Sequence, residues 1–254
     1  MESDLLSLLC DPDSRYSFEQ EGSTLRNVAT GRVYPIREEI PLFVSSLTGP
    51  NFSAQSFYDR IAPFYDFFAN VYGLLSQESD PRSSWFSLVN VQPGARVLDV
   101  GVGTGASVPF LPRDIDYFGI DISWNMLRRC RRRLQKLDRT GYLFQAEACH
   151  LPFRASVFDV VIHTLGIRTF GSPSRAIREM IWVARPGAQI LVVDRTNNVK
   201  QSGDTQGQQA HSLAEWVPPE MEHIETHALG GGDYECLTFR VPLDSDSIET
   251  EPKP

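Results

Sequence analysis

The feature that most constrains the fold is the segment VLDVGVGTG at residues 97–105. Its apolar residues are typical of a short buried strand, which carries Asp99 near its end and is followed by a glycine-rich turn. Gly101 and Gly103 carry no Cβ, so the backbone there can approach a ligand closely. A dinucleotide-binding GxGxxG turn is an alternative, but its spacing differs. A carboxylate directly before the turn is unsuited to a pyrophosphate and suits a ligand with a cationic end.

Apolar segments alternate with helical patterns from residue 95 onward. We expect strands at residues 96–100, 117–120, 142–146, 158–163 and 189–194. Ser123 is expected to cap a helix that runs through Leu134. A second helix is expected at residues 173–184, stopped by Pro186 and Gly187. This alternation predicts a parallel sheet with helices on both faces.

The two ends of the chain differ from this pattern. Residues 221–229 and 234–241 have no helix between them and predict an antiparallel hairpin at the sheet edge. Residues 242–254 are polar and acidic, and we expect a disordered tail. Residues 1–46 predict a small β-rich module, followed by a linker. Residues 52–90 predict an aromatic-rich helical lid over an apolar pocket.

Further polar residues follow the second and third expected strands. Asp121 ends the second strand, where an acidic residue can accept hydrogen bonds from both hydroxyls of a ribose. Met126, one helical turn later, could pack on an adenine ring or simply within the helix packing. Glu147 follows the third strand and could accept the adenine amino group, with the adjacent amide of Ala148 near the ring. Strand carboxyl ends meet at one edge of such a sheet, so these residues predict a nucleoside site there.

Four stretches together resemble the class I methyltransferases, and most closely the ubiquinone/menaquinone C-methyltransferase branch. They are VLDVGVGTG, GIDIS followed by ML, LPF followed by FDVVI, and IREMIWVARPGAQILVVD. The resemblance covers roughly residues 52–241. It implies a Rossmann-like α/β domain with a mostly parallel seven-stranded sheet. It also implies S-adenosyl-L-methionine (SAM) as cofactor and S-adenosyl-L-homocysteine (SAH) as product.

The resemblance also implies which residues contact the cofactor. The implied residues are Asp99, Gly101, Gly103, Asp121, Glu147 and Ala148, and Ile122 and Met126 are further candidates for cofactor contact. Tyr58 and Tyr65 lie in FYDRIAPFYD, which resembles the branch's N-terminal helix, and would close over the cofactor. Glu147 stands where an Asp is more usual. Arg168-Thr169-Phe170 stands where the branch has an Arg-Asn pair, which argues against carrying over its quinone acceptor.

The N-terminal module has a resemblance of its own. Leu6, Cys10-Asp11-Pro12 and YPIREEIP resemble zinc-ribbon-related modules that precede the core in a ribosomal-RNA guanine methyltransferase family. Four cysteines bind zinc there, whereas here only Cys10 remains, with Asp13, Asn27 and Thr30 near the other positions. Structural zinc normally needs four Cys or His ligands. We therefore predict no metal and four reduced thiols.

Two residues outside the cofactor set are candidates for catalysis. Methyl transfer needs a general base only if the acceptor must lose a proton. His163, at the end of the fourth strand, is the candidate base, and a structural histidine is the alternative. Arg168 could orient an anionic acceptor or form a salt bridge.

Charge and composition bear on the partners. The net charge of −8 argues against nucleic acid. The basic run at residues 128–136 is either a solvated helix face or an anion-binding patch. No apolar run approaches the ~20 residues that a membrane span needs, and the N-terminus lacks the basic flank of a signal peptide. We expect a cytoplasmic protein and leave its oligomeric state open.

Three functions fit the sequence. The first is methylation of a small, largely apolar or aromatic acceptor on carbon or oxygen. The second is methylation of an rRNA or tRNA base, supported by the N-terminal module and the arginine run. The third is a SAM-fold protein that binds the cofactor without methylating.

Overall fold

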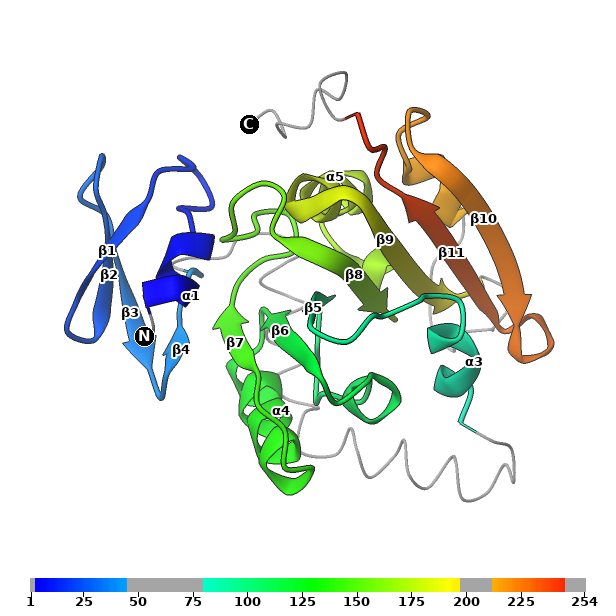
Figure 1. Ribbon diagram of the computed structural model, residues 1–254, viewed down its shortest axis with the longest axis horizontal. Helices are drawn as coiled ribbons and strands as arrows, with labels where there is room; N and C mark the ends of the chain where they lie inside the picture. The colour runs from blue at the N-terminus through cyan, green and yellow to red at the C-terminus, as the bar shows by residue number, and fades with distance from the viewer. Residues whose placement is uncertain (1–2, 45–79, 197–211, 245–254) are drawn as a thin grey trace.

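The computed structural model describes residues 3–44, 80–196 and 212–244, which contain two β-sheets (Figure 1). The larger sheet has seven strands in the order β10-β11-β9-β8-β5-β6-β7. Their bounds are β5 (Ala95–Val100), β6 (Ile115–Asp121), β7 (Tyr142–Gln145), β8 (Phe158–Thr164), β9 (Ala184–Arg195), β10 (Glu222–Leu229) and β11 (Tyr234–Arg240).

The five strands β5 to β9 pair in parallel, and β11 and β10 add an antiparallel edge. The predicted mostly parallel seven-stranded sheet and its edge hairpin are therefore confirmed. Within this sheet the chain runs first through β5, β6 and β7, and then returns to β8 on the other side of β5. Ligands of open α/β sheets bind at the strand carboxyl ends beside such a reversal.

Two long helices cover opposite faces of this sheet. In Figure 1, α5 (Pro173–Val183) lies above the sheet and α4 (Trp124–Lys136) lies below it. Alternate side chains of each strand supply the two apolar layers, since successive residues of a strand point to opposite faces. Leu98 belongs to the buried cluster on the α5 side, whereas Val97 belongs to the cluster on the α4 side.

Helix α4 begins as the sequence predicts. The Ser123 side chain accepts a hydrogen bond from the Met126 N–H at 3.2 Å, which satisfies one of the free donors of the first turn. The helix buries Leu127, Cys130 and Leu134, whose spacing of three and four residues places them on one face.

Helix α5 ends at Val183, within one residue of the predicted end and before the Pro186-Gly187 pair, as the sequence predicts. The pair itself lies inside β9, which begins earlier than the strand expected at residues 189–194. Pairing with β8 jumps from Phe158–Ala184 to Val160–Gln189, so residues 185–188 form a bulge. Proline cannot donate to a ladder, and bulges tolerate it.

The N-terminal residues form a separate antiparallel sheet. Helix α1 (Ser3–Leu8) precedes four strands in sequential order. These are β1 (Phe18–Glu21), β2 (Thr24–Asn27), β3 (Val33–Arg37) and β4 (Ile40–Pro41). The sheet lies beside β7, at the opposite end of the molecule from β10 (Figure 1). Its buried Phe18, Leu25 and Tyr34 belong to the same apolar cluster as the α5 side of the large sheet, whereas Ile40 belongs to the cluster on the α4 side.

The remaining described elements are short. They are α3 (Arg82–Phe86), η1 (Val108–Phe110), η2 (Ile167–Thr169), η3 (Leu213–Trp216) and η4 (Gly230–Gly232). Helix α3 falls within the helical stretch predicted at residues 52–90. The predicted lid tyrosines Tyr58 and Tyr65, the linker and most of the tail lie outside the described residues. No helix in the described ranges is long and apolar enough to cross a membrane.

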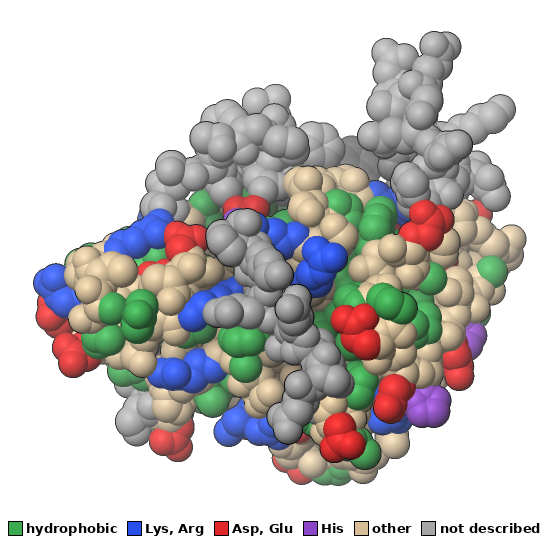
Figure 2. Space-filling model, turned by 90° about the horizontal axis from the view of Figure 1, so that it is seen from above, with side chains coloured by type: hydrophobic (Ala, Val, Ile, Leu, Met, Phe, Trp, Pro, Cys, Tyr) green, Lys and Arg blue, Asp and Glu red, His purple; other side chains and the backbone are tan. Residues whose placement is uncertain are grey.

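Charges of both signs are distributed over the surface. On the face above α5, Figure 2 shows Lys and Arg interspersed with Asp and Glu. Within the predicted basic run, Arg131 donates to the Glu38 carbonyl at 2.7 Å and pairs with the Glu38 carboxylate. One member of that run therefore links α4 to the N-terminal sheet.

Candidate functional site

The turn after β5 has the backbone conformation that its glycines predict. Gly101, Gly103 and Gly105 have φ values of +72°, +54° and +75°, a region that side chains with a Cβ rarely adopt. A Cβ at Gly103 would meet no atom of the described residues within 4 Å, so this part of the chain leaves the turn open there to a ligand. A Cβ at Gly105 would lie 2.9 Å from the Cys130 sulfur, so this glycine serves packing against α4.

The carboxylate of Asp121 is held against this turn. One of its oxygens accepts the Gly103 N–H at 2.8 Å, and the other accepts the Ser123 N–H at 2.8 Å. The residue is 8% exposed. Two backbone donors thus fix the orientation of an acidic group at the carboxyl end of β6. A carboxylate oxygen can accept more than one hydrogen bond.

Asp99 is fully buried beneath the turn. Its Oδ2 accepts hydrogen bonds from Ser107 Oγ at 2.7 Å and from Tyr117 OH at 2.9 Å. Its Oδ1 has no hydrogen-bond partner among the described residues. Burial raises the pKa of Asp99 to about 7, although the two hydroxyl donors oppose the rise. A cationic ligand group would favour the ionised form.

Ser107 and Tyr117 were not predicted as site residues. In the sequence, the hydroxyl groups of these two residues form no recognisable motif with Asp99. Only the pairing of β5 with β6 and the path of the turn bring them to the carboxylate.

The end of β7 lies next to Asp121. The Ala146 N–H donates to the Asp121 carbonyl at 3.2 Å. Glu147 then forms a short bridge with His150, and the two side chains approach to 3.7 Å. The Ile122 carbonyl accepts a hydrogen bond from the Gln145 side-chain amide at 2.9 Å. The ends of β6 and β7 are therefore tied together.

The other residues predicted to contact adenine flank these strand ends. Met126 is buried on the first turn of α4, at 2% exposure. Ala148 is partly buried against the apolar cluster on the α5 side.

His163 is buried at the carboxyl end of β8 and is 1% exposed. Its Nδ1 lies 2.6 Å from the Val100 carbonyl oxygen, so this nitrogen carries the proton and donates it. Its Nε2 has no hydrogen-bond partner among the described residues. Burial lowers the pKa of His163. The side chain is therefore a neutral imidazole beside Gly101, with the Nε2 lone pair unused.

Arg168 occupies an ion pair. Its Nη2 lies 2.7 Å from the Glu235 carboxylate, and its guanidinium lies 5.5 Å from the centre of the Trp216 ring. The same Glu235 carboxylate accepts Ser212 Oγ at 2.6 Å. This geometry matches the salt-bridge interpretation, in which Arg168 joins the loop after β8 to β11.

The positions related to zinc ligands in the N-terminal module are engaged in hydrogen bonds or buried. Asn27 Oδ1 accepts the N–H groups of Ala29 and Thr30, both at 2.9 Å. Asp13 pairs with Arg32, and Cys10 is buried. The part of the chain that is described contains no group of three or more His, Cys, Asp or Glu side chains able to hold a metal. The metal-free module stays a prediction.

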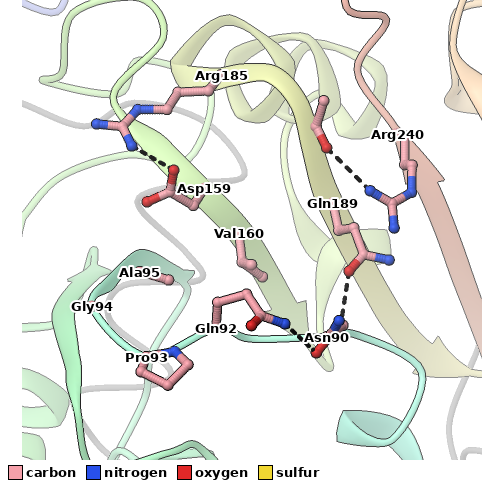
Figure 3. A pocket seen from close by; sticks show the side chains of 11 residues that line it. Asn90, Gln92, Pro93, Gly94, Ala95, Asp159, Val160, Arg185, Gln189 and Arg240 are labelled. Atoms are coloured by element: carbon pink, nitrogen blue, oxygen red, sulfur yellow. Dashed lines mark hydrogen bonds and ion pairs between the residues drawn. The ribbon is translucent and has the colours of Figure 1, made fainter.

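A cavity of about 470 Å³ lies near the amino ends of β5 and β8, at the opposite end of these strands from the glycine turn (Figure 3). Its polar groups bond one another. Arg185 pairs with Asp159 at 2.5 Å, and the Asn90 N–H donates to the Gln189 side chain at 3.0 Å. It is therefore separate from the glycine turn and its carboxylates.

The strand order, the glycine turn after β5 and the acidic end of β6 are those of the class I methyltransferase fold. Residues 98–192 match the methyltransferase domain family. The resemblance to the ubiquinone/menaquinone branch is also supported. The chain is 33% identical to the demethylmenaquinone methyltransferase of Renibacterium salmoninarum over 54% of this chain and 56% of that protein.

Two further similarities extend the comparison. The phosphatidylethanolamine N-methyltransferase of Cereibacter sphaeroides is 35% identical over 54% of this chain and 65% of that protein. The cyclase SpnF shares the fold, with a TM-score of 0.58 and 18% identity over 75% of this chain and 95% of that one. The chain thus spans less than two thirds of the length of the Renibacterium salmoninarum and Cereibacter sphaeroides proteins.

Proposed function

We propose that the protein is a SAM-dependent methyltransferase acting on a small, largely apolar or aromatic acceptor, on carbon or oxygen. The observation that carries the proposal is the orientation of Asp121 by the N–H groups of Gly103 and Ser123, beside an open glycine turn. A carboxylate fixed in this way can accept both hydroxyls of a ribose. Its place at the strand carboxyl ends is where open α/β sheets bind nucleotides.

The residues around Asp121 fit the remaining parts of SAM. Asp99 Oδ1, which has no hydrogen-bond partner in the described part of the chain, suits the cationic amino acid end, since a buried carboxylate is stabilised by a positive neighbour. Glu147 and Ala148 would meet the adenine, with Ile122 and Met126 packing near it. When bound, SAM supplies an electrophilic methyl group on a positively charged sulfur.

The proposed acceptor class is supported by two observations. The relatives are named for demethylmenaquinone and for phosphatidylethanolamine, a quinone and a phospholipid. The sequence between residues 52 and 75 is rich in aromatic residues, among them Tyr58 and Tyr65, which we propose close over the site.

We propose His163 as the proton acceptor when the methyl acceptor must lose a proton, since its neutral ring has an Nε2 lone pair without a partner among the described residues. Arg168, the candidate for orienting an anionic acceptor, has its guanidinium paired with Glu235. A His163→Phe variant should keep SAH affinity and lose most methyl transfer. Full activity in that variant would leave His163 with a packing role.

Calorimetry with SAH tests the cofactor site. Asp121→Ala should lose about 1–3 kcal/mol of binding because the ribose hydroxyls are left without an acceptor. Asp116→Ala is the matched control, because it removes an exposed carboxylate at the other end of the same strand. Unchanged affinity in Asp121→Ala would remove this residue from the site.

Transfer of a labelled methyl group from SAM tests the reaction. Wild-type protein is incubated separately with a lipid extract, an aromatic metabolite extract and total RNA. Label in either of the first two extracts supports the proposal, and label in RNA supports a base methyltransferase instead. SAH binding without label in any acceptor would favour a protein that binds the cofactor without methylating.

A further inference from the structure

The N-terminal module contacts the loop that follows β7, residues 146–153, at the beginning of this loop. The Phe43 N–H donates to the Gln145 carbonyl at 2.8 Å, and Leu42 pairs with Gln145 in a parallel bridge. Gln145 is the last residue of β7, directly before the segment that carries Glu147 and Ala148. The segment that follows β4 therefore bonds to the edge strand β7 at the position where the loop begins.

The N-terminal module also contacts the loop at its far end. The Cys10 N–H donates to the Pro152 carbonyl at 3.1 Å, and the Arg154 N–H donates to the Leu8 carbonyl at 2.9 Å. Leu9 and Phe153 form an antiparallel bridge between these two bonds. The loop is thus fixed by the same module where it leaves β7 and where it returns.

A buried ion pair fixes the middle of this arrangement. Arg15, from the N-terminal module, pairs with Glu179 of helix α5, whose side chain is fully buried. Arg15 Nη1 donates to the Leu151 carbonyl at 2.8 Å, and Glu179 Oε2 accepts the Leu151 N–H at 2.8 Å. Both backbone groups of one loop residue are therefore bound by the two partners of the pair.

The guanidinium suits this role because its several N–H donors lie in one fixed plane. It reaches the Glu179 carboxylate and the Leu151 carbonyl at the same time. It also lies 5.7 Å from the centre of the Trp182 ring, on the next turn of α5. The side chain is thus restrained on several sides.

We propose that Arg15 is a positioning residue for the cofactor, and that the N-terminal module is a working part of the SAM site. Through Leu151 and Glu179, Arg15 holds the segment from Glu147 to Phe153 in the shape that presents Glu147 and Ala148 to adenine. The inference rests on the proposed function for the identity of the ligand. The restraint of the loop does not depend on it.

The test compares Arg15→Gln with Arg26→Gln, using SAH as the ligand. Arg26 forms an exposed ion pair with Glu21 in the same module and contacts no part of the loop, so its variant controls for loss of one arginine. In Arg15→Gln we expect SAH affinity to fall at least about tenfold, equivalent to ~1.4 kcal/mol. In Arg26→Gln we expect it to stay within about twofold.

Amide hydrogen exchange of the ligand-free proteins separates positioning from a general loss of stability. In Arg15→Gln, residues 147–153 should exchange faster while strands β8 and β9 keep wild-type protection. Arg15→Lys, which keeps the charge but not the planar set of donors, should fold and show a smaller change of the same kind. If Arg15→Gln does not fold, the Arg15→Lys variant takes its place in the comparison.

Two results would overturn the inference. One is SAH affinity within about twofold of wild type in a folded Arg15 variant. The other is weaker affinity with unchanged exchange in residues 147–153. Failure of the wild-type protein to bind SAH would refute the proposed function instead, and the exchange comparison would still test whether Arg15 holds the loop.

Discussion

Replacing Asp99 by asparagine tests the electrostatics beneath the glycine turn. The carboxyl group is fully buried, and its pKa is raised from 3.8 to about 7. In the unfolded chain it titrates near its ordinary pKa of about 4. The folded protein therefore binds this proton more tightly than the unfolded protein does. The stability contributed by Asp99 is fully present below about pH 4 and is lost as the pH rises to about 7.

The expected size follows from linkage. Each pKa unit corresponds to about 1.4 kcal/mol, so a rise of about three units removes roughly 4 kcal/mol of stability over the full range. Between pH 5 and pH 8 the loss is roughly 2–3 kcal/mol. Asparagine does not titrate and escapes this loss. The stability of Asp99→Asn relative to wild type should therefore rise by roughly 2–3 kcal/mol from pH 5 to pH 8.

Urea unfolding of both proteins at pH 5, 6, 7 and 8 measures this difference. Asparagine places an amide nitrogen or oxygen where Oδ1 now lacks a partner, but that cost does not depend on pH and cancels. Asp114→Asn, which removes an exposed carboxylate, controls for the loss of one negative charge. A difference that stays flat, or that falls with rising pH, would refute the assignment of a raised pKa to Asp99. The variant should also bind SAM more weakly, since it cannot carry the charge opposite a cationic ligand.

Four other predictions follow from the structure and the sequence. Gly105→Ala should destabilise the protein by about 1–3 kcal/mol in urea unfolding, because its Cβ would lie 2.9 Å from the Cys130 sulfur; wild-type stability would contradict the close packing. Tyr34→Phe should cost about 1–2 kcal/mol, because it removes the donor to the buried Asp11 carboxylate at 2.9 Å; an unchanged unfolding midpoint would count against that bond. Purified protein should contain no stoichiometric zinc by elemental analysis, and zinc whose removal unfolds residues 1–46 would show that prediction to be wrong. Hydrogen exchange in residues 52–75 should slow when SAH binds if Tyr58 and Tyr65 close over the cofactor, whereas equal protection in both states would indicate permanent packing.

Much of the fold and part of the site could be predicted from the sequence because their signals are local. The Ser123 cap acts within one helical turn, and the left-handed turn after β5 needs glycine at Gly101 and Gly103. Alternation of apolar strands and helices leaves few topologies other than a parallel sheet with helices on both faces. Once β5 and β6 are parallel neighbours, Asp121 must end beside the glycine turn.

The sequence was misleading or silent where a residue's role depends on distant partners. Pro186 and Gly187 follow the end of α5 as expected, but their place in a bulge of β9 is set by pairing with β8 and was not predicted. Arg168 is equally suited to an acceptor or to a salt bridge, and only the position of Glu235 on β11 favours the second. Arg15 and Glu179 are 164 residues apart and match no motif.

The sequence by itself therefore determined the class of fold and predicted that the cofactor candidates lie at the carboxyl ends of the strands, because these depend on neighbouring residues and strand direction. Only the tertiary structure decided which buried charges are paired, that Asp99 has two hydroxyl donors, and that the N-terminal module bonds to both ends of the loop at residues 146–153. A buried polar group must find its partner in space. Which partner it finds depends on how complete elements pack, and no local pattern encodes that.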